Sequence, residues 1–259
     1  MSERLLAPDF KPTQAELLEE ALTMPGSMGN TYNRFRSYSL GNQALLYMQG
    51  ATEPVNTFKR WPDLNRHVKK GARAKSILVP LVYKEKDEHG KQESKIKGFK
   101  MTRCLFELSD TEGDDLPEYE PPEWSEPRAL GELAIKKVQF ESINGNIAGY
   151  SQERNIAISP IAPYPFKTLM HETAHVVLNH TTEEGLEEYR QHRGVAEFEA
   201  EGSAYLVMNA LEATDQFDAA ESREYIRGWL QGQTPPEVSI KKVFSTADKI
   251  VAAGRGATE

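Results

Sequence analysis

The alternation of apolar and polar residues predicts helices in the first part of the chain. Thr13 and Glu16 have the spacing of a capping box, and apolar residues follow at helical intervals, so we expect a helix over 13–24. Apolar positions three and four apart predict a second helix over 39–49. A third, shorter helix is expected over 57–67, although this segment contains a proline.

A strand hairpin is predicted to follow these helices. Residues 76–83 form an apolar run typical of a buried strand, and a polar stretch with Gly90 separates it from a second run at 98–108. The single cysteine, Cys104, lies in alternating context and is expected to be a packed strand residue rather than a reactive thiol. The helices and the hairpin predict an α+β module over residues 1–109.

A linker and a mostly helical region are predicted beyond the hairpin. Residues 110–127 are rich in acidic residues and prolines, a composition that cannot bury a core, and are expected to be a linker between two domains. The second domain, 128–259, is expected to begin with a helix over 129–137 and two strands, 138–150 and 155–159. Four more helices are predicted at 166–180, 194–212, 220–231 and 238–253.

Composition adds a charge asymmetry to this picture. The 259 residues are 39% hydrophobic and 27% charged, as in an ordinary globular protein, and the net charge is −8. Residues 1–109 contain 18 basic and 12 acidic residues, a balance of +6, whereas the remaining residues contain 13 and 27, a balance of −14. The first six residues do not resemble a signal peptide, and no apolar run is long enough to cross a bilayer, so we expect a cytoplasmic protein without a membrane partner.

The clearest chemical signal is the sequence His-Glu-Thr-Ala-His at 171–175. Two histidines four apart lie on one face of a helix and can bind one Zn²⁺, and Glu172 between them can act as the general base on its water. Because the flanking residues are apolar, the helix is expected to be buried, where a His-Glu-His trio needs a partner such as a metal. The alternative is a solvent-facing polar patch.

A third metal ligand is expected from the helix over 194–212. Glu197 and Glu201 share a face there, and we expect Glu197 to bind the metal while Glu201 accepts the free N–H of a ligand histidine. Glu199 points elsewhere and is expected on an exposed acidic face. His180 is expected about 140° round the first helix, away from the ligands. The oxyanion-stabilising group is left open among four candidates, Tyr150, Tyr189, His192 and Arg193.

The basic half has the composition of a nucleic-acid surface. Cationic residues and aromatic rings alternate between residues 30 and 75, a mixture that binds single-stranded nucleic acid through phosphate contacts and base stacking. Core packing of the rings and a solvated charged face remain the alternative. The candidate contact residues are Arg34, Arg36, Tyr38, Asn42, Lys59, Trp61, Lys69, Lys70 and Arg73. A fragment of residues 1–109 is expected to bind single strands alone.

The order of these features resembles the plasmid-borne ArdC antirestriction proteins. The matching segments are Tyr-Ser-Leu-Gly-Asn at 38–42, Asn-Thr-Phe at 56–58, Val-Lys-Lys-Gly at 68–71, the strand at 77–83, the motif at 171–175, Glu-x-x-Ala-Glu at 197–201 and the tail at 225–230. The resemblance implies an N-terminal domain that binds single-stranded DNA and a C-terminal metallopeptidase-like domain of the gluzincin type.

Three functions agree with the sequence. The leading hypothesis is a DNA-associated zinc metallopeptidase that hydrolyses a protein substrate, because Glu172 would not be needed in a purely structural site. The second is a non-enzymatic protein that protects single-stranded DNA and has a structural or vestigial zinc site. The third is a peptidase-type regulator that acts on a repressor.

Overall fold

Helices predominate in the α+β fold, as predicted from the sequence. The computed structural model describes residues 11–86, 92–141, 147–232 and 235–255. The α-helices are α1 (Gln14–Thr23), α2 (Ser27–Tyr32), α3 (Leu40–Met48), α4 (Glu126–Glu132), α5 (Pro165–Val177), α6 (Glu183–Gln191), α7 (Arg193–Ala210), α8 (Ala219–Gly232) and α9 (Glu237–Arg255). The strands are β1 (Val55–Thr57), β2 (Arg66–Val68), β3 (Lys75–Lys86), β4 (Gln92–Glu107), β5 (Thr111–Gly113), β6 (Lys136–Lys137), β7 (Gly149–Gln152) and β8 (Asn155–Ile158). None of the described helices is long and apolar enough to cross a membrane.

The first predicted helix begins at its predicted cap. The Thr13 hydroxyl accepts a hydrogen bond from the Glu16 N–H, and the Glu16 carboxylate accepts one from the Thr13 N–H at 2.8 Å, which completes the capping box. The helix predicted over 39–49 is also confirmed, with Ser39 as the N-cap of α3. Local capping chemistry therefore determines where both helices begin.

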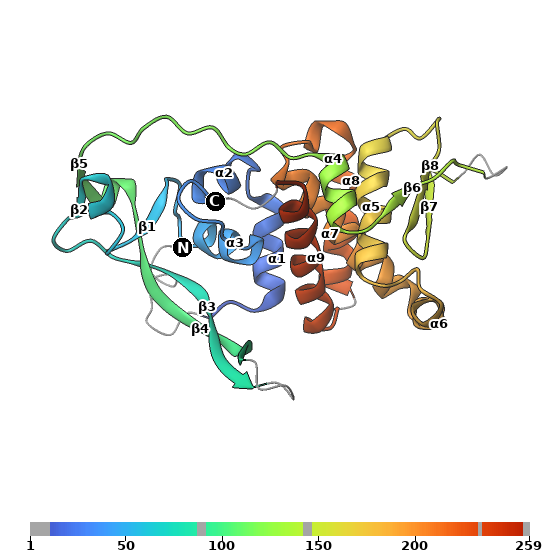
Figure 1. Ribbon diagram of the computed structural model, residues 1–259, viewed down its shortest axis with the longest axis horizontal. Helices are drawn as coiled ribbons and strands as arrows, with labels where there is room; N and C mark the ends of the chain where they lie inside the picture. The colour runs from blue at the N-terminus through green and yellow to red at the C-terminus, as the bar shows by residue number, and fades with distance from the viewer. Residues whose placement is uncertain (1–10, 87–91, 142–146, 233–234, 256–259) are drawn as a thin grey trace.

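The predicted hairpin is present and is longer than expected. Strands β3 and β4 pair antiparallel, with Leu78 opposite Met101 and Pro80 opposite Phe99, and β1 joins the other edge of β4. Figure 1 shows the hairpin projecting away from the helices. Cys104 is half-buried on β4, as predicted, and the turn with Gly90 lies outside the described residues.

The prediction of a helix over 57–67 is wrong. The segment contains the end of β1, a 3-10 turn at Pro62–Leu64 and strand β2, which pairs with β5 more than 40 residues later. Asn65 has a positive φ of 54°, which ends the turn. Proline and this left-handed residue make a continuous helix impossible, and a strand partner distant in sequence was not visible in the local pattern.

The predicted linker is in part structured and is held against the body. Its first residues include the end of a 3-10 turn, Leu108–Asp110, and strand β5, and an extended segment then passes over the helices to α4 (Figure 1). The Trp124 indole N–H donates to the Ile250 carbonyl at 3.2 Å, and its ring packs edge-on against Phe166. The helix expected over 129–137 is α4, displaced towards the N-terminus because Ser125 caps it.

The C-terminal region largely matches the prediction. Helices α5, α7, α8 and α9 lie where four helices were expected, whereas α6 was not predicted. Strands β7 and β8 form the expected pair, with β6 parallel to β8 on the other side, and residues 142–146 of the predicted strand over 138–150 lie outside the described residues. A further 3-10 turn covers Thr214–Gln216.

One apolar core connects the two halves of the chain. Leu18 of α1 and Leu45 of α3 belong to the same buried cluster as Phe198 of α7 and Val243 of α9. The Tyr205 hydroxyl of α7 donates to the Leu22 carbonyl at 2.9 Å, near the end of α1. The helices of residues 1–109 are therefore packed into the second half, so a 1–109 fragment would expose part of this core.

Candidate metal centre and nucleic-acid surface

Helix α5 presents the His-Glu-x-x-His motif towards α7. Pro165 stands at its first position, and Leu169, Met170 and Ala174 are buried in the core. These apolar positions fix the rotation of the helix, so His171 and His175, one turn apart, both face α7. The polar motif thus lies on a helix that apolar packing holds rigid.

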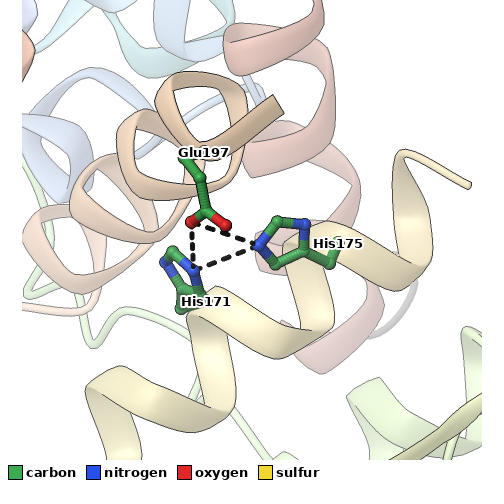
Figure 2. A group of neighbouring side chains, drawn as sticks. All are labelled: His171, His175 and Glu197. Atoms are coloured by element: carbon green, nitrogen blue, oxygen red, sulfur yellow. Dashed lines mark hydrogen bonds and ion pairs between the residues drawn. The ribbon is translucent and has the colours of Figure 1, made fainter. Parts of the chain in front are cut away.

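Three side chains converge between the two helices, as Figure 2 shows. The His171 and His175 Nε2 atoms are 3.1 Å apart, and Glu197 Oε2 lies 3.4 Å from the first and 3.7 Å from the second. An ion bound tetrahedrally at about 2.0–2.1 Å separates its ligand atoms by roughly 3.3–3.4 Å. The spacing and the two-imidazole, one-carboxylate donor set therefore fit one metal ion.

Glu201 lies behind His171, at the position expected of an orienting group. Its Oε2 is 3.1 Å from His171 Nδ1 and 2.6 Å from Lys167 Nζ, and its Oε1 accepts a hydrogen bond from the Ser222 hydroxyl at 2.5 Å. A carboxylate held in this way accepts the Nδ1 proton of His171, so Nε2 is the nitrogen that faces the cluster and would bind a metal once it is deprotonated.

The electrostatics of the cluster concentrate negative charge where a cation would lie. The neighbouring imidazoles of His171 and His175 hold the pKa of Glu197 far below its usual range, although burial acts in the opposite direction. Burial lowers the pKa of His171, but hydrogen bonds to Glu197 and Glu201 outweigh it and raise that pKa to about 9. Burial lowers the pKa of His175. Without a metal, one proton on His171 therefore compensates the carboxylates.

Glu172 has a partner from the neighbouring sheet. The Ser151 hydroxyl of β7 donates to Glu172 Oε2 at 2.5 Å, which restrains the carboxylate beside the cluster. Among the oxyanion candidates, the Tyr189 hydroxyl donates to Glu197 Oε1 at 2.6 Å, and Arg193 Nε lies 3.9 Å from the same oxygen. His192 is exposed, and Tyr150 packs its ring against Phe140.

Two predictions about nearby residues were wrong. Glu199 is 2% exposed rather than on an exposed acidic face, and hydrogen bonds from His180 and Ser239 keep its pKa below normal although burial raises it. The ring of His180 lies against His175, with 3.0 Å between their Nδ1 atoms. The prediction placed His180 by continuing the helix, whereas α5 ends at Val177.

Most of the charged residues in the predicted nucleic-acid surface are exposed, whereas its two aromatic residues, Tyr38 and Trp61, are buried. Trp61 is 0% exposed and donates its indole N–H to the Phe106 carbonyl, and Tyr38 is 8% exposed. The Asn42 amide exchanges two hydrogen bonds with the Leu78 backbone, at 2.8 and 3.0 Å. All three side chains are therefore engaged within the protein, by packing or by hydrogen bonds to the backbone.

Five of the six predicted cationic contact residues are exposed. Arg34 is half-buried beside the rings of Phe35 and Tyr119. Phe58 is 62% exposed next to Lys59, so a ring suited to base stacking is present at a position absent from the predicted contacts. The exposed basic side chains of the predicted set are Arg36, Lys59, Lys69, Lys70 and Arg73.

Comparison with known proteins agrees with the resemblance noted in the sequence. Residues 12–107 match the family model described as the N-terminal domain of anti-restriction factor ArdC. The metal-free crystal structure of antirestriction ArdC from plasmid R388 is similar, with 16% identity, a TM-score of 0.53, and coverage of 93% of this chain and 94% of that chain. Its Mn(II)-bound structure has 17% identity, a TM-score of 0.50, and coverage of 91% and 88%. No curated protein sequence matches significantly. Residues 12–107 therefore form an ArdC-type N-terminal domain, and the chain shares the fold of R388 ArdC over nearly its whole length.

Proposed function

We propose that this chain is an antirestriction protein that binds single-stranded DNA and hydrolyses a protein substrate at a zinc centre. The observation that carries the proposal is the convergence of His171, His175 and Glu197 beside Glu172. The antirestriction role is inferred from the ArdC proteins, which the chain resembles in its N-terminal domain and in its fold. Zinc suits two imidazoles and one carboxylate, whereas the related R388 structure was described with Mn(II).

His171, His175 and Glu197 would hold the ion. A bound Zn²⁺ would acidify its water and polarise the scissile carbonyl. The Glu172 carboxylate accepts the proton of the attacking water and delivers it to the leaving amine, and the Ser151 hydroxyl restrains one of its oxygens. Tyr189 is the half-buried candidate for stabilising the oxyanion, once its hydroxyl turns from Glu197 towards the substrate, since Arg193 is largely exposed.

The N-terminal half would bring this site to DNA. The residues on its loops, Lys59 after β1 and Lys69, Lys70 and Arg73 between β2 and β3, are exposed and can neutralise phosphates. Phe58 supplies an accessible ring beside Lys59. The C-terminal half is acidic, so a strand of DNA is expected to follow the basic half alone.

The test is metal analysis together with proteolysis assays of the full chain, with and without single-stranded DNA. Wild type is expected to bind one zinc ion per chain and to cleave a protein substrate, Glu172→Gln to keep the metal and lose cleavage, and His171→Ala to lose both. Glu183→Gln, at an exposed position of α6, is the matched control. Metal binding without any Glu172-dependent cleavage would favour a non-enzymatic protein that protects DNA.

A further inference from the structure

The chain reverses direction directly after the metal-binding helix. Asn179 has a positive φ of 62°, the His180 N–H donates to the His175 carbonyl at 3.0 Å, and the Asn179 N–H donates to the Val176 carbonyl at 3.1 Å. This pair of bonds is a Schellman motif, in which asparagine replaces the usual glycine. The turn moves His180 off the helical path and folds its ring back onto the helix that carries the ligands.

The reversed segment starts a part-buried series of polar contacts between side chains. His180 Nδ1 lies 3.0 Å from His175 Nδ1, and His180 Nε2 lies 3.3 Å from Glu199 Oε2. The same Glu199 oxygen lies 3.3 Å from Lys242 Nζ on α9. These polar contacts therefore connect α5, α7 and α9, and each one joins two side chains within hydrogen-bonding distance.

The contacts determine which nitrogen of each ring carries a proton. An ionised carboxylate only accepts, so in the neutral form of His180 the Nε2 atom donates to Glu199 and the Nδ1 atom is left as an acceptor. His175 Nδ1 must then donate, which leaves the lone pair of His175 Nε2 directed at His171 and Glu197. This is the tautomer that a metal ligand requires.

The two histidines of the cluster are thus supported differently. Glu201 contacts His171 Nδ1 directly, at 3.1 Å, whereas Glu199 reaches His175 only through the intervening imidazole of His180. We propose that His180 and Glu199 are positioning residues that hold His175 in its metal-binding tautomer and orientation. The inference rests on the proposed metal site and adds two residues that act through His175 without touching the ion.

The positioning residues are also reachable from outside the metal cluster. A cavity of about 310 Å³ is bordered by His180, Glu199 and Lys242, and His192 lies on the same cavity. His171, Glu172 and Glu197 do not border it. Substitutions at His192 therefore perturb the same cavity without interrupting the polar chain, which provides a matched control.

The test measures Zn²⁺ affinity of the full chain by competition with a chelator. His180→Ala is expected to weaken binding by about 10 to 100-fold, Glu199→Ala by less, and His192→Ala by nothing measurable. Glu199→Gln keeps an acceptor oxygen for His180 and should recover much of the loss. As a control, circular dichroism and thermal unfolding of the metal-free proteins should show that each variant is folded.

A tautomer measurement separates positioning from a general structural effect. Long-range ¹H–¹⁵N spectra of the metal-free protein should show His175 protonated at Nδ1 in wild type and in His192→Ala, and a mixture of both tautomers in His180→Ala. Wild-type affinity and an unchanged His175 tautomer in His180→Ala, with zinc lost in His171→Ala, would overturn the inference and leave the metal site intact. Absence of zinc binding in wild type would overturn both.

Discussion

Asp248 connects the two halves of the chain, and its burial predicts that the stability of the protein depends on pH. This residue of α9 accepts a hydrogen bond at 2.8 Å from the Leu40 N–H, at the start of α3. Burial raises the pKa of Asp248 from 3.8 to about 6, although the Leu40 hydrogen bond acts in the opposite direction. A shift of about two pKa units corresponds to at most about 3 kcal/mol.

The direction of this pH dependence follows from the higher pKa of Asp248 in the folded state. The folded chain binds the proton of Asp248 more tightly than the unfolded chain does. Protonation of Asp248 therefore stabilises the folded state most below pH 3.8, and this contribution is lost as the pH rises through about 6. Asp248→Asn mimics the protonated form and keeps an oxygen for Leu40. The variant should match wild type near pH 4 and be more stable near pH 7 by up to about 3 kcal/mol.

Urea unfolding of both proteins at the two pH values measures this difference directly. Asp215→Asn, at an exposed position, is the control for a generic loss of charge. The reasoning is refuted if the free energy difference between wild type and Asp248→Asn stays constant between pH 4 and 7, or if wild type gains relative to the variant as the pH rises.

Three further predictions concern ligands, DNA and packing. Zinc titration should show that Glu197→Ala loses most of the metal affinity and Glu201→Ala about 10 to 100-fold, and equal losses would contradict their different places in the cluster. In the full chain, Lys69, Lys70 and Arg73 should be replaced together by alanine. This triple variant should lower the salt slope of single-stranded DNA binding by roughly two units, at about 0.7 per phosphate contact, as measured by fluorescence anisotropy. Leu18→Ala should cost about 2–5 kcal/mol by urea unfolding, whereas Leu81→Ala, at an exposed hairpin position, should cost less than about 0.5 kcal/mol.

Local patterns predicted much of this structure. The capping box of α1 and the apolar face of α5 depend on residues within one or two turns, so both helices could be located from the sequence alone. The spacing of Glu197 and Glu201 likewise brought both carboxylates to the correct face of α7. Their metal-binding roles stay predictions.

Features that depend on distant contacts were missed. The pairing of β2 with β5 overrides the helical pattern around Trp61, and the same ring is buried because an aromatic residue serves a core as readily as a binding surface. The place of His180 depended on a single left-handed residue, Asn179, and asparagine after an apolar helix was the available signal. Thr182, which caps α6, was a similar signal for the unpredicted helix.

The core shared by α1, α3, α7 and α9 has a consequence for synthesis of the chain on the ribosome. The Leu40–Asp248 hydrogen bond joins residues 208 apart in sequence, and Tyr205 reaches Leu22 over 183 residues. The apolar faces of the first helices therefore emerge long before the segments that cover them, and contacts this distant form slowly. The N-terminal half must wait exposed until α9 leaves the exit tunnel, so premature termination would yield a product prone to aggregation and degradation.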